Sequence, residues 1–392
     1  MKPLEGLIVL DLGPRVSGSF CCKIMAMLGA EVIKVEAPQR SDQSHGQGGE
    51  LHKALRLYLD TSKKSITLDL NQQAGSALLS MLTASCDVLV HSYHPRQAQY
   101  SILNPSALTR KNPRIIVTSI SDFGSGGTYE DYVGSSIVGL AMSGYMYLSG
   151  ERDREPLMIP GEQPEYHAGL YAYIATTAAL WSRTTTGKGC QIEIAMQEAV
   201  ASLSQFTIVQ YTYSGSIRTR HGNLWENSHP LTIWPCQDGH IGVCAAGQDA
   251  WERLCQMMDK PELIMDPRFA GPAERHTNAH ELDSIVSDWL TTRTRQEVFH
   301  LAEGEWRLPM GPLYELDEVL ADPQLKERGF WVKVPADNHP ELLQPGLPFV
   351  MSDATWEATP APTPGAHNEE VFCRRLGLTP LELEELRSAG IV

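Results

Sequence analysis

The 392-residue sequence has no block of basic residues: 32 lysines and arginines stand against 47 aspartates and glutamates, for a net charge of −15. Affinity for nucleic-acid phosphates is built from clustered lysine and arginine, so a nucleic-acid partner is not expected. The sequence also has no uninterrupted apolar run of ~20 residues, which argues against a transmembrane helix and a membrane partner. Its first apolar run, residues 7–10, is interrupted by Asp11, which is not typical of a signal peptide.

The eight cysteines are scattered, and none lies in a CxxC pair or in a cysteine–histidine cluster with the spacing of a zinc site. We therefore expect no bound metal, and free, buried thiols in a reducing, cytoplasmic setting. The Walker loop, the HExxH motif and the GxSxG motif are also absent. The sequence thus offers none of the motifs typical of a P-loop nucleotidase, a zincin protease or an α/β-hydrolase.

What the sequence does contain is an alternation of apolar strands and helices. Residues 6–12 are apolar with little alternation, as expected of a parallel strand covered on both faces. A turn at Gly13-Pro14, a helix through residues 20–28 and a strand at residues 31–36 follow. Further strands are expected at 65–70, 87–91, 115–120 and 191–194, with helices at 74–84, 169–185 and 198–213. The predicted fold class is α/β with a Rossmann-like, doubly wound sheet, whose ligands bind at the carboxyl ends of the strands.

The character of the sequence changes near residue 221. We expect a large domain over residues 1–200 and a smaller α+β domain over residues 221–330. The smaller domain is predicted to contain a turn at residues 236–239 and helices near residues 251–258 and 280–291. Residues 331–392 are rich in proline and are expected to extend over the surface before a short final helix at residues 380–386.

Glu165 is the carboxylate whose position most suggests chemistry, because it directly precedes the long helix expected at residues 169–185. The helix dipole stabilises a carboxylate there, so a helix cap is one interpretation. The other is a nucleophile or general base at a domain crevice. Lys63 and Lys64 also allow two interpretations, a solvated pair or point charges for a phosphate. Three histidines of this region are expected to be structural or surface residues: His91, His94 and His167.

A series of short segments carries the strongest signal in the sequence. In chain order they are Pro3–Asp11 (PLEGLIVLD), Leu28–Glu36 (LGAEVIKVE), Lys63–Leu70 (KKSITLDL), Arg183–Gln191 (RTTTGKGCQ), Asp266–Phe269 (DPRF), Asp322–Leu325 (DPQL), Pro364–His367 (PGAH) and Leu376–Leu378 (LGL). In this order they resemble the class III CoA-transferase family, also called CaiB/BaiF. The family contains formyl-CoA transferase, carnitine CoA-transferase and α-methylacyl-CoA racemase. The resemblance covers residues 3–392.

The resemblance implies a particular fold and assembly. Family members have a large Rossmann-like domain built from both chain ends and a small middle domain. Residues 331–392 would therefore return to the large domain. Two subunits interlock like links, each threaded through the other, so we expect a homodimer or a heteromer with a homologous subunit.

The resemblance also implies a reaction. Family transferases use an aspartate four residues ahead of a glycine, and the matching position here is Glu165, ahead of Gly169. In those enzymes the carboxylate attacks an acyl-CoA thioester, and CoA passes through anhydride and enzyme–CoA thioester intermediates to an acceptor acid. Glu165 would then be the catalytic residue. The substrates would be an acyl-CoA and a free carboxylic acid, and no metal or ATP is required.

The resemblance further assigns a set of residues to coenzyme A: Val16, Ser17, Arg40, Lys63, Ser92, Tyr93 and Arg96. Tyr93 keeps an aromatic side chain that can lie against adenine, and Arg96 can meet a phosphate. Arg40 lies three residues beyond Ala37, which occupies a position where the family often has arginine. The glycine-rich loop of formyl-CoA transferase has no clear counterpart, and residues 221–230 occupy its region.

Glutamate in place of aspartate leaves more than one function open. Its extra methylene moves the reacting oxygen by roughly 1 Å, a shift that can cost ~100-fold in rate. The chain is then either a self-sufficient transferase or a non-catalytic subunit that works with a homologous, aspartate-bearing partner. An acyl-CoA racemase is a third alternative, but it typically needs a histidine beside the carboxylate, and residues 125–136 contain none.

Overall fold

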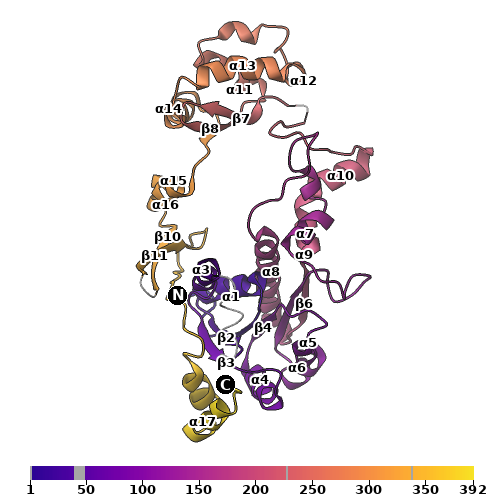
Figure 1. Ribbon diagram of the computed structural model, residues 1–392, viewed down its shortest axis with the longest axis vertical. Coiled ribbons are helices and arrows are strands. Elements are labelled where there is room, and N and C mark those ends of the chain that lie inside the picture. The colour runs from indigo at the N-terminus through magenta and orange to yellow at the C-terminus, as the bar shows by residue number, and fades with distance from the viewer. Residues whose placement is uncertain (1, 39–48, 227, 337–338) are drawn as a thin grey trace. The chain divides into compact units, whose positions relative to one another are not determined.

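The computed structural model describes residues 2–38, 49–226, 228–336 and 339–392. The chain divides into two compact units. The larger contains Met1–Tyr145, Met158–Gln210 and Glu327–Val392, and the smaller contains Met146–Leu157 and Tyr211–Lys326. The smaller unit thus includes a segment, 146–157, that the sequence analysis places in the large domain. Figure 1 shows the C-terminal segment, in yellow, lying beside the indigo N-terminal segment within the larger unit.

A parallel sheet forms the centre of the larger unit. Its strands are β1 (Ile8–Leu12), β2 (Glu31–Glu36), β3 (Lys64–Thr67), β4 (Val88–His91), β5 (Ile116–Ser121) and β6 (Gln191–Ala195). Their order in the sheet is β3-β2-β1-β4-β5-β6, and all pairs are parallel. This is the order of a Rossmann-like, doubly wound sheet, so the predicted fold class is confirmed. The strand order reverses between β1 and β4, where such sheets bind their ligands.

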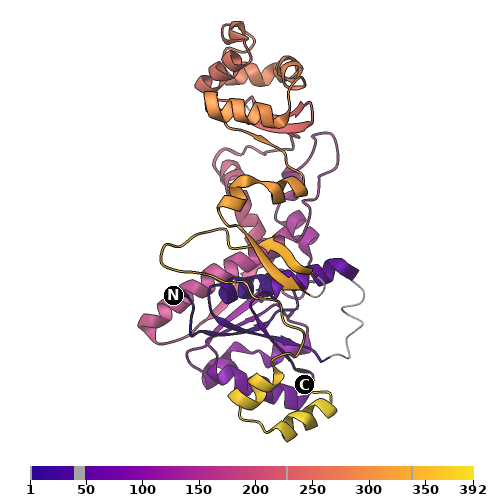
Figure 2. The same cartoon turned by 90° about the vertical axis from the view of Figure 1, so that its left-hand side faces the viewer.

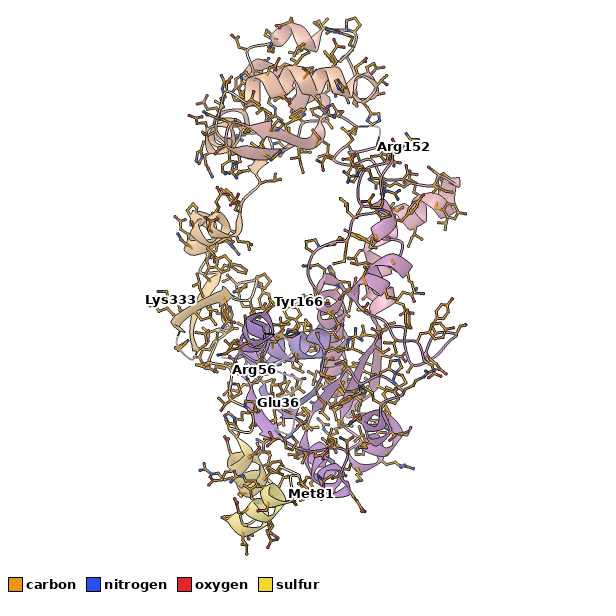
Figure 3. The ribbon with its side chains drawn as sticks, viewed as in Figure 1. Glu36, Arg56, Met81, Arg152, Tyr166 and Lys333 are labelled. Atoms are coloured by element: carbon orange, nitrogen blue, oxygen red, sulfur yellow. The ribbon has the colours of Figure 1, made fainter. Side chains whose placement is uncertain are left out.

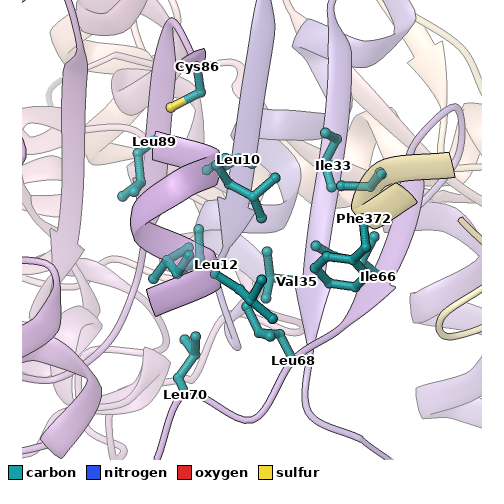
Figure 4. Packing of buried hydrophobic residues seen from close by; sticks show 14 of the residues in the cluster. Leu10, Leu12, Ile33, Val35, Ile66, Leu68, Leu70, Cys86, Leu89 and Phe372 are labelled. Carbon is teal, nitrogen blue, oxygen red and sulfur yellow. The ribbon is translucent and has the colours of Figure 1, made fainter. Parts of the chain in front are cut away.

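Helices cover both faces of the sheet because the strands are apolar on both faces. One face packs against α4 (Gln73–Ser85), α6 (Pro105–Lys111), the helical segment η5 (Glu369–Arg375) and α17 (Pro380–Ser388). Figure 4 shows this core, to which β1 contributes Leu10 and in which Ile33 of β2 lies close to Phe372 of η5. Burying each of these side chains contributes about 1.5–3 kcal/mol. The C-terminal residues are therefore part of the core of the larger unit.

The opposite face packs against α1 (Val16–Met27) and α8 (Gln163–Thr186). Val9 and Val32 of the sheet meet Cys21 and Met25 of α1 and Ala172 of α8. The view in Figure 2, turned from that of Figure 1, likewise shows α1 and α8 on one side of the sheet and α17 on the other. Other helices of the larger unit are α3 (Gly49–Leu59), α5 (Ala98–Ile102), α7 (Ser136–Met142) and α9 (Met196–Ala201).

Three elements differ from the sequence prediction. The long helix α8 begins at Gln163, six residues before its expected start, so Glu165 lies inside the helix rather than ahead of it. The helix expected at residues 198–213 is two helices, α9 and α10 (Gln205–Ser214), separated by a single 3₁₀ turn at residues 202–204. In the proline-rich segment β10 (Trp331–Ala336) pairs antiparallel with β11 (His339–Pro345).

The smaller unit contains an antiparallel sheet, with β7 (Leu231–Cys236), β8 (Gly239–Cys244) and β9 (Met310–Pro312) in that order. The predicted turn at 236–239 joins β7 to β8. The sheet packs against α11 (Gln248–Met257), α13 (Ala279–Leu290) and α14 (Arg295–Leu301). The first two correspond to the helices that the sequence predicts there. Shorter helices are α12 (Pro272–Thr277), α15 (Leu316–Ala321) and α16 (Pro323–Glu327), and the last residue of α16 is assigned to the larger unit.

All eight cysteines are free. Cys190 and Cys244 are exposed, so the expectation of buried thiols is wrong at these two positions. Within the described ranges, no three His, Cys, Asp or Glu side chains gather in a way that could hold a metal ion. In those same ranges no helix is long and apolar enough to cross a membrane.

Candidate active site

The close crossing of α8 over α1 positions Glu165. Gly169 of α8 lies against the backbone of α1, because a Cβ atom at this glycine would lie 2.5 Å from the Ser17 carbonyl oxygen. Tyr166, labelled in Figure 3, packs edge-on against Phe20 of α1 with ring centroids 4.9 Å apart. Glu165 is in the first turn of α8. The crossing therefore places its carboxylate at the N-terminus of α1.

Two groups bind the Glu165 carboxylate. The backbone N–H of Ser17, in the first turn of α1, donates to Oε2 at 3.1 Å. The Arg15 side chain donates to Oε1 through Nε at 2.7 Å, and its Nη2 donates to the same oxygen. Glu165 is 5% exposed and Ser17 is 1% exposed. One oxygen thus accepts from a backbone N–H at a helix N-terminus and the other accepts from a cation.

Asp122 binds the remaining end of the same guanidinium. It follows β5, and its Oδ1 accepts from Nη1 of Arg15 at 2.6 Å, while Oδ2 accepts from the Gly134 N–H at 2.9 Å. Burial would lower the pKa of the Arg15 guanidinium, but the charges of Glu165 and Asp122 raise it above its ordinary value. Arg15 is therefore a fixed cation between two carboxylates that are almost fully buried.

The turn after β1 presents Arg15. Its backbone N–H donates to the Ser92 hydroxyl, just beyond β4, at 3.2 Å. Gly13 and Gly18 lie so close together that a Cβ atom on either would be 3.2 Å from the other's Cα. The ends of β1 and β4 therefore meet at the point where the strand order reverses, and Arg15 leaves from that point.

A cavity of about 850 Å³ opens beside this cluster. Its lining includes Arg15, Asp122 and Glu165, together with Ser92, Arg96 and the apolar side chain of Ile137. Every residue that lines it belongs to the larger unit. The buried carboxylate cluster thus has direct access to a space large enough for part of a substrate.

Two of the predicted coenzyme A residues, Ser92 and Arg96, line this cavity, and two more, Val16 and Ser17, lie in the first turn of α1. Val16 is the first residue of α1, and Ser17 and Ser92 contact Glu165 and Arg15 as described. Arg96 is exposed on the cavity wall, with Nη2 3.3 Å from Oδ2 of Asp131. The geometry is compatible with the predicted role of these residues, which stays a prediction.

Tyr93 and Lys63 are placed differently from the other predicted contacts. Tyr93 is partly buried against the hydrophobic core of the larger unit, and burial, followed by the charge of Asp11, raises its pKa to about 12. Lys63 is fully buried, and its Nζ donates to Asp11 at 2.7 Å and to Asp60 at 3.2 Å. The interpretation of Lys63 as half of a solvated pair is therefore wrong. Its enclosed ammonium gives the expected phosphate contact no support. Arg40 lies outside the described residues.

The histidine in the cavity wall has both ring nitrogens occupied. Nδ1 of His94 accepts from the Arg96 N–H at 3.1 Å, and Nε2 lies 3.0 Å from the Tyr132 carbonyl oxygen. These two bonds assign the neutral tautomer with its proton on Nε2. His91 is buried, which lowers its pKa to about 4. The structural interpretation fits the contacts of His94. Nδ1 of His91 is buried without a hydrogen-bond partner in the part of the chain that the structure describes.

The sequence analysis missed Arg15 and Asp122. Neither belongs to a recognisable local pattern, since Arg15 lies in a turn and its partner Glu165 is 150 residues away. The usable signal was positional: both follow strands of the predicted sheet, and the carboxyl ends of parallel strands share one edge.

Two named CoA-transferases are similar to this chain along its whole length. Succinyl-CoA–D-citramalate CoA-transferase of Chloroflexus aurantiacus is 33% identical over 399 residues, covering 100% of this chain and 98% of the relative. Formyl-CoA:oxalate CoA-transferase of Streptomyces coelicolor is 30% identical over 413 residues, covering 100% and 99%. Both relatives are thus matched along their full length.

Solved structures show the same fold. A CaiB/BaiF family protein from Brucella suis matches with a TM-score of 0.85 and 28% identity, over 95% of this chain and 99% of that one. A Mycobacterium tuberculosis protein matches with a TM-score of 0.81 and 25% identity, over 94% and 98%. The family model described as CoA-transferase family III matches residues 4–368. The chain belongs to CoA-transferase family III.

Proposed function

We propose that the protein transfers CoA from an acyl-CoA thioester to a free carboxylic acid, with Glu165 as the nucleophile. The observation that supports this most is the position of the Glu165 carboxylate. It is buried at the N-terminus of α1, bound by Arg15 and the Ser17 N–H, and it faces a cavity of about 850 Å³. A carboxylate in such a site can act as an acyl-forming nucleophile, which is what CoA transfer requires.

The proposed reaction has two halves. An oxygen of Glu165 attacks the donor's thioester carbon, and the C–S bond breaks to give a mixed anhydride and CoA thiolate. The thiolate attacks Cδ of Glu165, and the C–O bond breaks to release the donor acid and leave a glutamyl–CoA thioester. The acceptor carboxylate then attacks Cδ and expels the thiolate. That thiolate attacks the acyl carbon of the acceptor, which releases the new thioester and restores Glu165. No proton is consumed overall.

Coenzyme A would approach along the crevice where β1 and β4 end. The first turn of α1 lies there with Val16 and Ser17, and Ser92 and Arg96 follow β4. In doubly wound sheets this edge binds the ligand, and a free N-terminus of a helix favours anions. The relatives' names mention succinyl-CoA with D-citramalate and formyl-CoA with oxalate, so these donors and acceptors are the first probes to use.

Mass spectrometry of the Glu165 peptide tests the proposal. The protein is incubated with succinyl-CoA or acetyl-CoA and quenched with borohydride, which reduces a glutamyl thioester to an alcohol. We expect a mass loss at Glu165 in the wild type and none in Glu165→Gln. Glu198→Gln, which alters an exposed first-turn acid of α9, is the matched control and should label like the wild type.

The alternative is a non-catalytic subunit that needs an aspartate-bearing homologue. Measurable CoA binding without any modification of Glu165 would favour that alternative over a self-sufficient transferase. Light scattering addresses the assembly, since an interlocked dimer has twice the mass of the 43.3 kDa chain. The racemase alternative lacks support, because the ring nitrogens of His94 in the cavity wall are both bonded to backbone groups.

A further inference from the structure

The two oxygens of the Glu165 carboxylate accept different hydrogen bonds. Oε1 accepts two N–H groups from the guanidinium, whereas Oε2 accepts, among the described residues, the Ser17 N–H alone. An oxygen that accepts two charged donors is the weaker nucleophile and the better position for developing negative charge. Oε2 is therefore the oxygen suited to attack, and Oε1 is the oxygen suited to remain as the carbonyl.

This difference matters when the CoA thiolate attacks Cδ of Glu165. In that step negative charge moves onto the carbonyl oxygen of the anhydride, and the bond to the bridging oxygen then breaks. With Oε2 as the bridging oxygen, the charge develops on Oε1, which faces Nε and Nη2 of Arg15. The same two donors face the oxyanion when the acceptor acid attacks the thioester.

Acylation also changes the charge around Arg15. Before the reaction the guanidinium has two counter-ions, Glu165 and Asp122, and after acylation Glu165 is neutral. Asp122 keeps its charge, its contact to Nη1 at 2.6 Å and its bond from the Gly134 N–H at 2.9 Å. The guanidinium thus has one partner whose charge does not change during the reaction.

We infer that Arg15 stabilises the oxyanion at Oε1 of Glu165, and that Asp122 is a positioning residue that holds Arg15 in place while Glu165 is acylated. The inference rests on the proposed function. It adds a catalytic cation and its anchor to the nucleophile.

A double-mutant cycle on the rate of glutamyl–CoA formation tests the inference. Removing one oxyanion donor typically costs ~10²–10³-fold, so we expect Arg15→Gln to lower the single-turnover rate and kcat by that factor, with little change in KM. Asp122→Asn should lower the rate by up to ~100-fold in the wild-type background, because it lets Arg15 shift. It should cost little more in the Arg15→Gln background, because Asp122 acts through Arg15.

Two further variants separate catalysis from folding. Arg15→Lys keeps a point charge without the planar fork and should recover part of the rate lost in Arg15→Gln. Arg387→Gln removes one side of an exposed pair with Glu384 on α17 and should leave the rate unchanged. If Arg15→Gln does not fold, the rates of Arg15→Lys and Asp122→Asn are compared with the wild-type rate instead. Urea unfolding midpoints are measured for each variant.

The outcomes distinguish the inference from the proposed function. Labelling of the wild type together with unchanged rates in both Arg15 variants would overturn the inference and leave Glu165 as the nucleophile. Equal losses from Asp122→Asn in both backgrounds would overturn the positioning role. Absence of labelling in the wild type would instead refute the proposed function, and the inference with it.

Discussion

Lys63 and Asp11 form an ion pair in which both side chains are fully buried. Nζ of Lys63 lies 2.7 Å from Oδ2 of Asp11, and both side chains are 0% exposed. The same Nζ donates to the Ser19 carbonyl oxygen of α1 at 3.0 Å, and Oδ1 of Asp11 accepts from the Gly13 N–H. The pair thus ties the start of β3 to the turn that presents Arg15.

We expect Lys63→Met to destabilise the protein by about 3–5 kcal/mol, because it leaves Asp11 as a buried charge without its partner. Lys64→Met is the matched control. Lys64 is partly exposed and pairs with Glu31 and Glu370, so its loss should cost no more than about 1 kcal/mol. Urea unfolding of the two variants gives the comparison.

A direct contact between Lys63 and coenzyme A gives the opposite pattern. In that case Lys63→Met would weaken CoA binding while its unfolding midpoint stayed near that of the wild type. Calorimetric titration with CoA, performed on the folded variant below its unfolding midpoint, distinguishes the two roles.

Lys23 makes stability depend on pH. Its Nζ is buried, 2.7 Å from the Tyr58 carbonyl oxygen, and burial, followed by the charge of Lys63, lowers its pKa from 10.5 to about 7. The unfolded chain keeps this proton up to its ordinary pKa. Between about pH 7 and 10.5 the unfolded state therefore binds more protons than the folded state. The contribution of Lys23 to stability then rises with pH by up to ~1.4 kcal/mol per unit.

Urea unfolding of the wild type and of Lys23→Met, near pH 7 and near pH 10, measures this contribution. Methionine keeps the length of the side chain without its charge, so the variant should lose the positive slope. We expect the free energy of unfolding of Lys23→Met to exceed that of the wild type most near pH 7. The same dependence of the unfolding free energy on pH in both proteins would contradict the lowered pKa of Lys23.

The sheet was predictable because its central strands β1 and β4 are short, buried apolar runs, which are typical of parallel strands covered on both faces. The start of α8 was also open to prediction: Pro164 in the first turn is a common feature of a helix N-terminus. The antiparallel pair of β10 and β11 was not predicted, because prolines in the segment argue against strands. Edge strands, however, accommodate proline.

The site could be predicted only in part. Glu165 was found because a carboxylate beside a long helix is a local pattern, and because the family resemblance places the nucleophile four residues before a glycine. The burial of Lys63 was not predicted, because its partners Asp11 and Asp60 come from separate elements of the fold. Two adjacent lysines are solvated in most sequences, and only tertiary packing decides otherwise. Arg15 was missed for the same reason, since its partners are Asp122, just after β5, and Glu165 in α8.

Gly169 sets the distance between α8 and α1. Alanine normally stabilises a helix relative to glycine by up to ~1 kcal/mol. Here its Cβ would lie 2.5 Å from the Ser17 carbonyl oxygen, so α8 must move away from α1. We expect Gly169→Ala to lengthen the contact of Ser17 with Glu165 and to lower kcat by up to ~100-fold.

Gly126→Ala is the control for this substitution, because a Cβ atom at Gly126 meets nothing within 4 Å. Steady-state rates and unfolding midpoints are compared for both variants. A Gly169→Ala protein with the wild-type rate would show that the site does not depend on the close approach of the two helices.

Glu165→Asp tests whether the site has adapted to the longer acid. Arg15 and the Ser17 N–H both contact the glutamate carboxylate, at 2.7 and 3.1 Å, and aspartate would withdraw it by roughly 1 Å. A misplacement of that size costs ~100-fold, so we expect kcat to fall by about this factor while KM changes little. Glu198→Asp makes the same chemical change on the surface of α9 and should have no effect.

Whether Glu165→Asp loses or gains activity distinguishes a self-sufficient transferase from a non-catalytic subunit. A slower variant means that Arg15 and Ser17 hold a glutamate nucleophile in its reacting position. A wild-type protein that forms no adduct, beside an aspartate variant that does, would mean that Glu165 has replaced the family's nucleophile in a subunit that no longer reacts. The site would then still be shaped for aspartate, and the chain would depend on an aspartate-bearing partner for CoA transfer.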